Sequence, residues 1–150
     1  MTMQGFFLRL KADRSGSTII EFAILAPMIF AMLFGVIQVG IQMWSYNSLR
    51  SILADTARYT MVEYQKGNSL SPEQIESKAI AIAVNSPYDF NIDQIDINPP
   101  TTIVAGDSDY IAGMTGFSLT MSYTPPTVLD FTGIRAPTLT ITRPIYVASS

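Results

Sequence analysis

The longest apolar run of the chain constrains its fold more than any other feature. Residues 22–37 contain no polar side chain, and extending the run to residues 19–43 adds only Glu21, Gln38 and Gln42. This stretch is longer than the roughly 20 residues that an α-helix needs to span a bilayer. Only 14% of the chain is charged, against about a quarter in a typical soluble domain. We therefore expect a transmembrane helix over residues 17–44.

Two other interpretations of the apolar run fit less well. A cleaved secretory signal has an apolar core of about 7–15 residues followed by a small-x-small site, whereas residues 42–47 contain no such site. A buried core helix is also disfavoured, because the rest of the chain is too small to surround it. Insertion into a membrane is the favoured interpretation.

The charges on the two sides of the run predict its orientation. Residues 1–16 form a basic leader with one acid, Asp13, and three basic residues, Arg9, Lys11 and Arg14. Basic flanks stay in the cytoplasm, so residues 45–150 are expected to be exported, although Arg50 and Arg58 weaken this bias slightly. Acids outnumber basic residues after residue 64, so no nucleic-acid partner is expected.

The composition disfavours catalysis. The chain has no cysteine and no histidine, which excludes disulfides, thiolate chemistry, Cys/His metal sites and the usual general base. No phosphate-binding loop or catalytic triad is present. Asp107 and Asp109 resemble a calcium-binding turn, but the other ligands of such a loop are missing, so a solvated turn is favoured. We expect no enzyme, no cofactor and no metal.

Two helices are expected in the region that leads into the exported domain. Apolar residues recur at helical spacing through residues 46–64, so the membrane helix is predicted to continue as an amphipathic one. A second, short helix should begin at Ser71, with Pro72 at its first position and Gln74 completing a capping box. The predicted inner faces comprise Leu49, Ile52, Leu53, Ala57, Thr60 and Tyr64 on the first helix and Ile75, Ala79, Ile82 and Ala83 on the second.

The C-terminal part of the chain has the pattern of β-strands. Apolar and polar residues alternate through residues 90–97, 116–123 and 138–148, with one slip in phase at residues 93–94. Three or four strands in a small antiparallel sheet are expected, with Pro144 on an edge or at a bulge. The predicted class is a membrane-anchored α+β fold, in which the second helix and the sheet cover the exported part of the first helix.

Glu21 is unusual because it lies inside the apolar run. A carboxylate costs about 3 kcal/mol in the middle of a membrane and less near the boundary, so an interfacial acid is the simplest explanation. However, Glu21 is also the fifth residue after Gly16. If a peptidase cut after Gly16, the new ammonium group of Ser17 would compensate Glu21, within one chain or between staggered helices. A buried charge pair of this kind is better evidence for a fixed alignment of helices than for a gain in stability.

These residues resemble a known family. The short basic leader, Gly16 and the Glu21–Phe22 pair are similar to class IV prepilins of the Flp/Tad branch, and residues 19–40 and 52–61 resemble the TadE-like family of minor pilins or pseudopilins. The resemblance implies a pilin-like fold, cleavage between Gly16 and Ser17 by a prepilin peptidase, and placement in the bacterial inner membrane with the N-terminus in the cytoplasm. It also implies other pilins, pseudopilins and Tad secretion-system membrane proteins as partners.

Other residues of the run are candidates for helix register or assembly. Pro27 removes one helical hydrogen bond and can kink the span, and a harmless kink is an equally good explanation. Gly35, Gln38 and Gly40 are candidates for contacts between helices, because small residues allow close approach and glutamine can hydrogen-bond a neighbour. Members of the family often have a second acid in this region, where this chain has Gln38.

Two functions are therefore compared. The first is a TadE-like pseudopilin that takes part in assembling a tight-adherence pilus, with Glu21, Phe22 and Pro27 in its assembly helix. The second is a single-pass membrane-anchored periplasmic binding or structural domain unrelated to pili, for which Gly16 is incidental.

Overall fold

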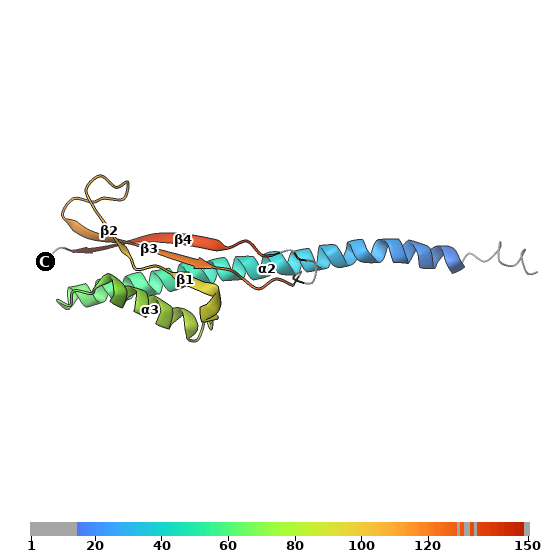
Figure 1. The fold of residues 1–150 in the computed structure, drawn as a ribbon, viewed down its shortest axis with the longest axis horizontal. Coiled ribbons are helices and arrows are strands. Elements are labelled where there is room, and N and C mark those ends of the chain that lie inside the picture. Colours follow the sequence, from blue (N-terminus) through green and yellow to red (C-terminus); the bar gives the residue numbers. More distant parts are fainter. Residues whose placement is uncertain (1–14, 129, 131–132, 134, 149–150) are drawn as a thin grey trace, which may run out of the picture. The chain divides into compact units, whose positions relative to one another are not determined.

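The computed structural model describes residues 15–128, 130, 133 and 135–148, and side chains among them from residue 18 to residue 147. Most of the basic leader, with Arg9, Lys11 and Arg14, lies outside the described residues. The chain divides into two compact units, Met1–Val39 and Gly40–Ser150. The first contains the N-terminal part of a long helix, and the second contains its C-terminal part with all the other elements (Figure 1).

The first helix, α2 (Ser15–Gln65), has 51 residues. The predicted continuation of the apolar helix into an amphipathic one is confirmed, since α-helix is unbroken from one pattern to the other. Pro27 lies inside it. The helix ends where Gly67 adopts a positive φ of 84°, a conformation that glycine reaches without steric cost.

The second helix, α3 (Pro72–Val84), begins as predicted. The Ser71 hydroxyl accepts a hydrogen bond from the backbone N–H of Gln74, and the Gln74 side chain accepts one from the backbone N–H of Ser71. This capping box satisfies two backbone donors that the first turn of a helix leaves without partners. Three of the four predicted inner residues, Ile75, Ala79 and Ala83, are buried, and Ile82 is half-buried.

A four-stranded antiparallel sheet follows. Its longest strands, β3 (Met114–Tyr123) and β4 (Leu139–Ala148), pair along their whole length. The short strands β1 (Ile95–Ile97) and β2 (Thr101–Ile103) pair with two separate segments of β3. Within the described residues β4 has β3 as its only partner strand, so the prediction that Pro144 lies on an edge is confirmed.

Two details of the predicted strands are wrong. The strand expected over residues 90–97 is reduced to β1, because η1 (Ile92–Gln94) is a short 3-10 helix at the slip in phase. Asn91 caps this turn, since its side chain accepts the backbone N–H of Asp93 at 3.0 Å. Strand β2 was not predicted, because its three residues are too few to show a periodic pattern.

The hydrophobic core lies between α2, α3 and the sheet, all within the second unit (Figure 1). From α2 it takes the predicted face, with Leu49, Ile52 and Leu53 at most 1% exposed. The alternate residues of β3 complete it from the other side. The predicted α+β class is confirmed, as is the covering of this part of α2 by α3 and the sheet. The sheet residues of this core cluster are Ile97, Phe117, Leu119, Met121, Tyr123, Ile145 and Val147.

Candidate functional site

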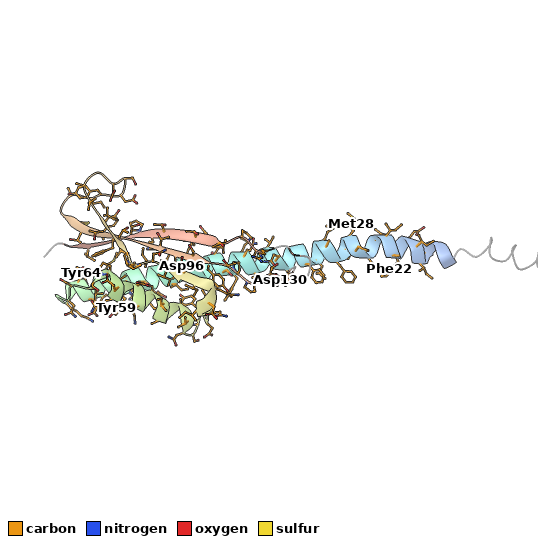
Figure 2. The ribbon with its side chains drawn as sticks, viewed as in Figure 1. Phe22, Met28, Tyr59, Tyr64, Asp96 and Asp130 are labelled. Carbon is orange, nitrogen blue, oxygen red and sulfur yellow. The ribbon has the colours of Figure 1, made fainter. Side chains whose placement is uncertain are left out.

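The N-terminal part of α2 exposes apolar side chains on every side. Between Ile19 and Val39, the exposed large apolar residues have 42% to 73% of their surface accessible. Figure 2 shows the side chains of Phe22 and Met28 extending away from the helix, and these are 67% and 63% exposed. Burying such a surface is strongly favourable, so an apolar surface of this extent marks contact with a membrane or with other proteins.

Length and composition agree with that conclusion. In the described part of the chain, one helix is long and apolar enough to cross a membrane, Thr18–Gln65, and none of its most apolar window is buried. A core helix of a soluble protein would be mostly buried.

Glu21 and Phe22 lie on the first turns of this apolar segment. Both are exposed within the chain. Ile20 precedes Glu21, and Ile24 follows it by about one helical turn. Gly16 and Ser17 belong to the first turn of α2, and the side chain of Ser17 lies outside the described part. The roles predicted for these four residues stay predictions.

The predicted contact residues of the helix have different surroundings. A methyl group added at Gly35 or at Gly40 would meet no atom within 4 Å, so both positions have room beside the helix. Gln38 is buried, with 8% of its surface exposed. At Pro27 the missing N–H leaves the carbonyl of Ala23 without its helical donor. Contacts of these positions with another helix stay predictions.

An aromatic cluster lies where α2 enters the domain, and the sequence analysis did not anticipate it. The Phe90 and Tyr123 rings stack, and the Trp44 ring meets Phe90 edge-on with centroids 5.6 Å apart. Burial raises the pKa of the Tyr123 phenol, and its hydroxyl lies 3.4 Å from Oε1 of Gln94. Trp44 remains 54% exposed. Trp44 is also the last residue of the predicted transmembrane segment, a position where tryptophan often marks the membrane boundary, but local sequence gives no indication of its contact with Phe90.

The acidic turn at residues 105–109 has a structural explanation. The Asp107 carboxylate accepts the backbone N–H of Val104 at 2.9 Å, which stabilises the turn locally. Among the described residues no three histidine, cysteine, aspartate or glutamate side chains are grouped so as to hold a metal ion.

Together these features define an α+β protein with a long apolar N-terminal helix whose apolar surface is exposed. The model of the TadE-like protein family matches residues 16–58. The resemblance predicted from the sequence is confirmed over this segment, which begins at Gly16 and ends within the part of α2 that packs in the core. The TadE-like family is a pilus-associated structural family, not known for enzymes. No curated protein and no solved structure gives a significant match to this chain.

Proposed function

We propose that this protein is a minor pilin or pseudopilin that takes part in assembling a pilus of the tight-adherence type. The observation that carries the proposal is the coincidence of two features on one segment. Residues 16–58 match the TadE-like family, and the same segment contains the exposed apolar part of α2 with Glu21 near its start.

In this proposal residues 17–44 span the bacterial inner membrane. The basic leader, residues 1–16, lies in the cytoplasm, and residues 45–150 form a periplasmic domain. The exposed apolar surface of α2 supports a lipid environment because water would solvate it at a large cost. The basic residues before Gly16 support the orientation.

A prepilin peptidase would cut after Gly16, so that Ser17 becomes the first residue of the working protein. Its ammonium group would lie about one turn from Glu21, in the same or a neighbouring helix. In a medium of low dielectric constant this charge pair is favourable only in one alignment. Glu21 would therefore set the register in which the helix joins other pilins, with Phe22 and Pro27 shaping the same contact surface.

Mass spectrometry of the protein from cells that make the pilus tests the processing. A mature N-terminus at Ser17 is expected in the wild type, and Gly16→Leu should retain the leader. An intact N-terminus in cells with active prepilin peptidase would contradict this step. A cut within residues 42–47 would instead identify a secretory signal.

Electron microscopy of pili tests the role of Glu21. Glu21→Ala should abolish piliation while the protein still inserts into the membrane, as measured by carbonate extraction. Ile24→Ala is the matched control, because Ile24 is a similarly exposed residue of the same helical segment, and it should leave piliation unchanged. Normal piliation in Glu21→Ala would remove the proposed role. Full function of a Gly16→Leu variant would favour a membrane-anchored periplasmic domain unrelated to pili.

A further inference from the structure

A depression on the domain lies between α2 and β4, and two arginines line it. It lies wholly within the second unit of the chain. Arg50 comes from α2 and Arg143 from the middle of β4, so residues far apart in sequence supply the two guanidinium groups. The lining residues are Tyr46, Arg50, Leu53, Ile141, Thr142 and Arg143.

No acid lines this depression in the described part of the chain. The ion pair found among described residues, Lys66 with Glu63, lies at the far end of α2. Arg50 instead lies over the ring of Tyr46, with its guanidinium carbon 5.8 Å from the ring centroid. Two like charges on one depression repel each other, and a bound anion would relieve that repulsion. The chain is otherwise acidic, with a net charge of −3.

The direction of Arg50 brings its charge toward the apolar segment. Long side chains on a helix point toward the helix N-terminus, and the contact with Tyr46 one turn earlier agrees. Tyr46 follows Trp44 by two residues, a rise of about 3 Å along the axis. If Trp44 marks the edge of the hydrocarbon, the guanidinium of Arg50 lies at the depth of the lipid headgroups, which occupy several ångströms outside that edge.

We propose that this depression is a binding site for the headgroup of an anionic phospholipid. Guanidinium groups bind phosphate oxygens through paired N–H donors, and the phenol of Tyr46 can donate a further hydrogen bond. The half-buried side chain of Ile141 offers an apolar surface that suits the glycerol carbons. The site rests on the proposed anchoring of α2, and it would hold the domain against the surface of the membrane.

The experiment uses the full chain in neutral detergent, titrated with phosphatidylglycerol and followed by native mass spectrometry. The double variant Arg50→Gln/Arg143→Gln should bind phosphatidylglycerol about thirtyfold more weakly. Each basic residue near an anionic lipid surface strengthens binding about fivefold, and the two factors multiply. Arg58→Gln is the matched control, because Arg58 is an exposed arginine of α2 outside the depression. Phosphatidylcholine and inorganic phosphate form the other two arms, and circular dichroism checks the fold of each variant.

The outcomes separate the possible ligands. The site is supported if the affinity for phosphatidylglycerol falls in the double variant but not in Arg58→Gln. Equal affinity in wild type and double variant overturns it. Inorganic phosphate that binds as tightly as the lipid also overturns it, because the site would then recognise a free anion.

Failure of the anchoring proposal gives a different result. Trp44 is the single tryptophan of the chain, so its quenching by spin-labelled lipid in vesicles reports insertion alone. Absence of quenching in the wild type would contradict the membrane anchor itself. Quenching that is equal in wild type and double variant, together with unchanged lipid affinity, would contradict only the headgroup site.

Discussion

The rings of Phe90 and Tyr123 stack face to face, with centroids 4.3 Å apart and an interplanar angle of 5°. Phe90 lies between α3 and η1, and Tyr123 is the last residue of β3. Their contact therefore ties the end of the central strand to the segment that follows α3. Trp44 of α2 meets the Phe90 ring of this pair, so three segments of the domain meet at one aromatic cluster.

Loss of this stack should destabilise the domain strongly. Phe90 is only 5% exposed, and truncation of a buried phenylalanine to alanine costs about 3–5 kcal/mol. Phe90→Ala should lower the free energy of unfolding by that amount, measured by urea denaturation of the full chain in detergent with Trp44 fluorescence. Ile92→Ala is the control, because Ile92 is 59% exposed and should change stability by less than about 0.5 kcal/mol. Equal losses in the two variants would contradict a stabilising role for the stack.

The capping box of α3 should contribute less to the free energy of unfolding than the aromatic stack does. Ser71→Ala removes the oxygen that accepts the N–H of Gln74, and loss of such a cap costs about 1 kcal/mol. The same denaturation experiment measures it. Ser77→Ala changes an exposed serine inside α3 and should be neutral or slightly stabilising, because alanine is the better helix former. A Ser71→Ala variant as stable as Ser77→Ala would show that the cap adds nothing.

A close approach between β2 and β3 requires a residue without a side chain at Gly116. A methyl group there would lie 3.0 Å from Cδ1 and 3.1 Å from Cβ of Ile103, its directly paired residue on β2. Gly116→Ala should cost about 1–3 kcal/mol through overpacking. In an Ile103→Ala background the cost should be smaller, because the Cδ1 contact is gone. Strict additivity in this double-mutant cycle would argue against the clash.

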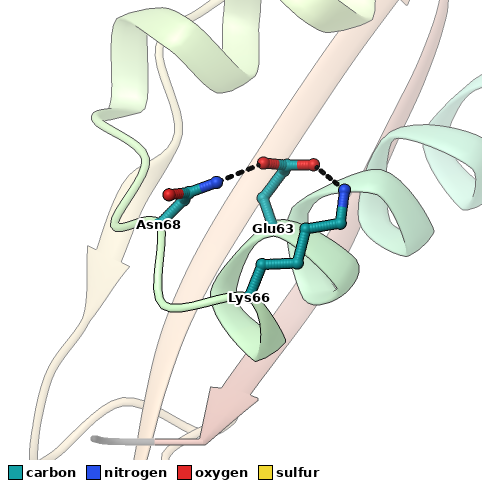
Figure 3. Close-up of polar contacts among 3 residues, drawn as sticks. All are labelled: Glu63, Lys66 and Asn68. Carbon is teal, nitrogen blue, oxygen red and sulfur yellow. Dashed lines mark hydrogen bonds and ion pairs between the residues drawn. The ribbon is translucent and has the colours of Figure 1, made fainter.

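The C-terminal turn of α2 should respond to acid through Glu63. Hydrogen bonds from Lys66 at 2.7 Å and Asn68 at 2.8 Å lower the pKa of its carboxyl below the ordinary 4.5 (Figure 3). A lowered pKa means that the ionised carboxylate stabilises the folded chain above that ordinary value, and that this contribution is lost as the pH falls through the folded-state pKa. NMR titration of the Glu63 side chain should therefore give a higher pKa in Lys66→Gln than in the wild type.

Two further measurements complete this test. The melting temperature of Lys66→Gln should be below that of the wild type at pH 7, and the gap should narrow as the pH falls below 4.5. High salt should also narrow the gap, because Lys66 is 59% exposed to solvent and its attraction to Glu63 is screened. Lys78→Gln is the control, since Lys78 lies over the ring of Tyr59 instead of near a carboxylate. An unchanged titration of Glu63 in Lys66→Gln would contradict the assignment.

Local patterns along the sequence were sufficient to predict much of this fold. The apolar run predicted the N-terminal part of α2, helical spacing predicted its buried face, and Ser71 with Gln74 predicted the start of α3. Alternation predicted β3 and β4, because strands of ten residues repeat the pattern often enough to be recognised. The motif that opens at Gly16 predicted the family that matches residues 16–58. Each of these signals depends on residues close together in the sequence.

Tertiary structure decided everything that depends on distant pairing. η1 replaced the first half of a predicted strand, and β2 formed although its three residues carry no periodic signal. β2 forms because pairing with β3 provides partners for its backbone groups, which no local pattern encodes. η1 forms at the slip in phase, where the Asn91 side chain accepts the backbone N–H of Asp93. The contact of Trp44 with Phe90 and the placement of Arg50 and Arg143 around one depression also depend on residues far apart in the sequence. Sequence determined the apolar helix and its acid at Glu21, whereas only packing placed an aromatic cluster and a pair of arginines beside the end of that helix.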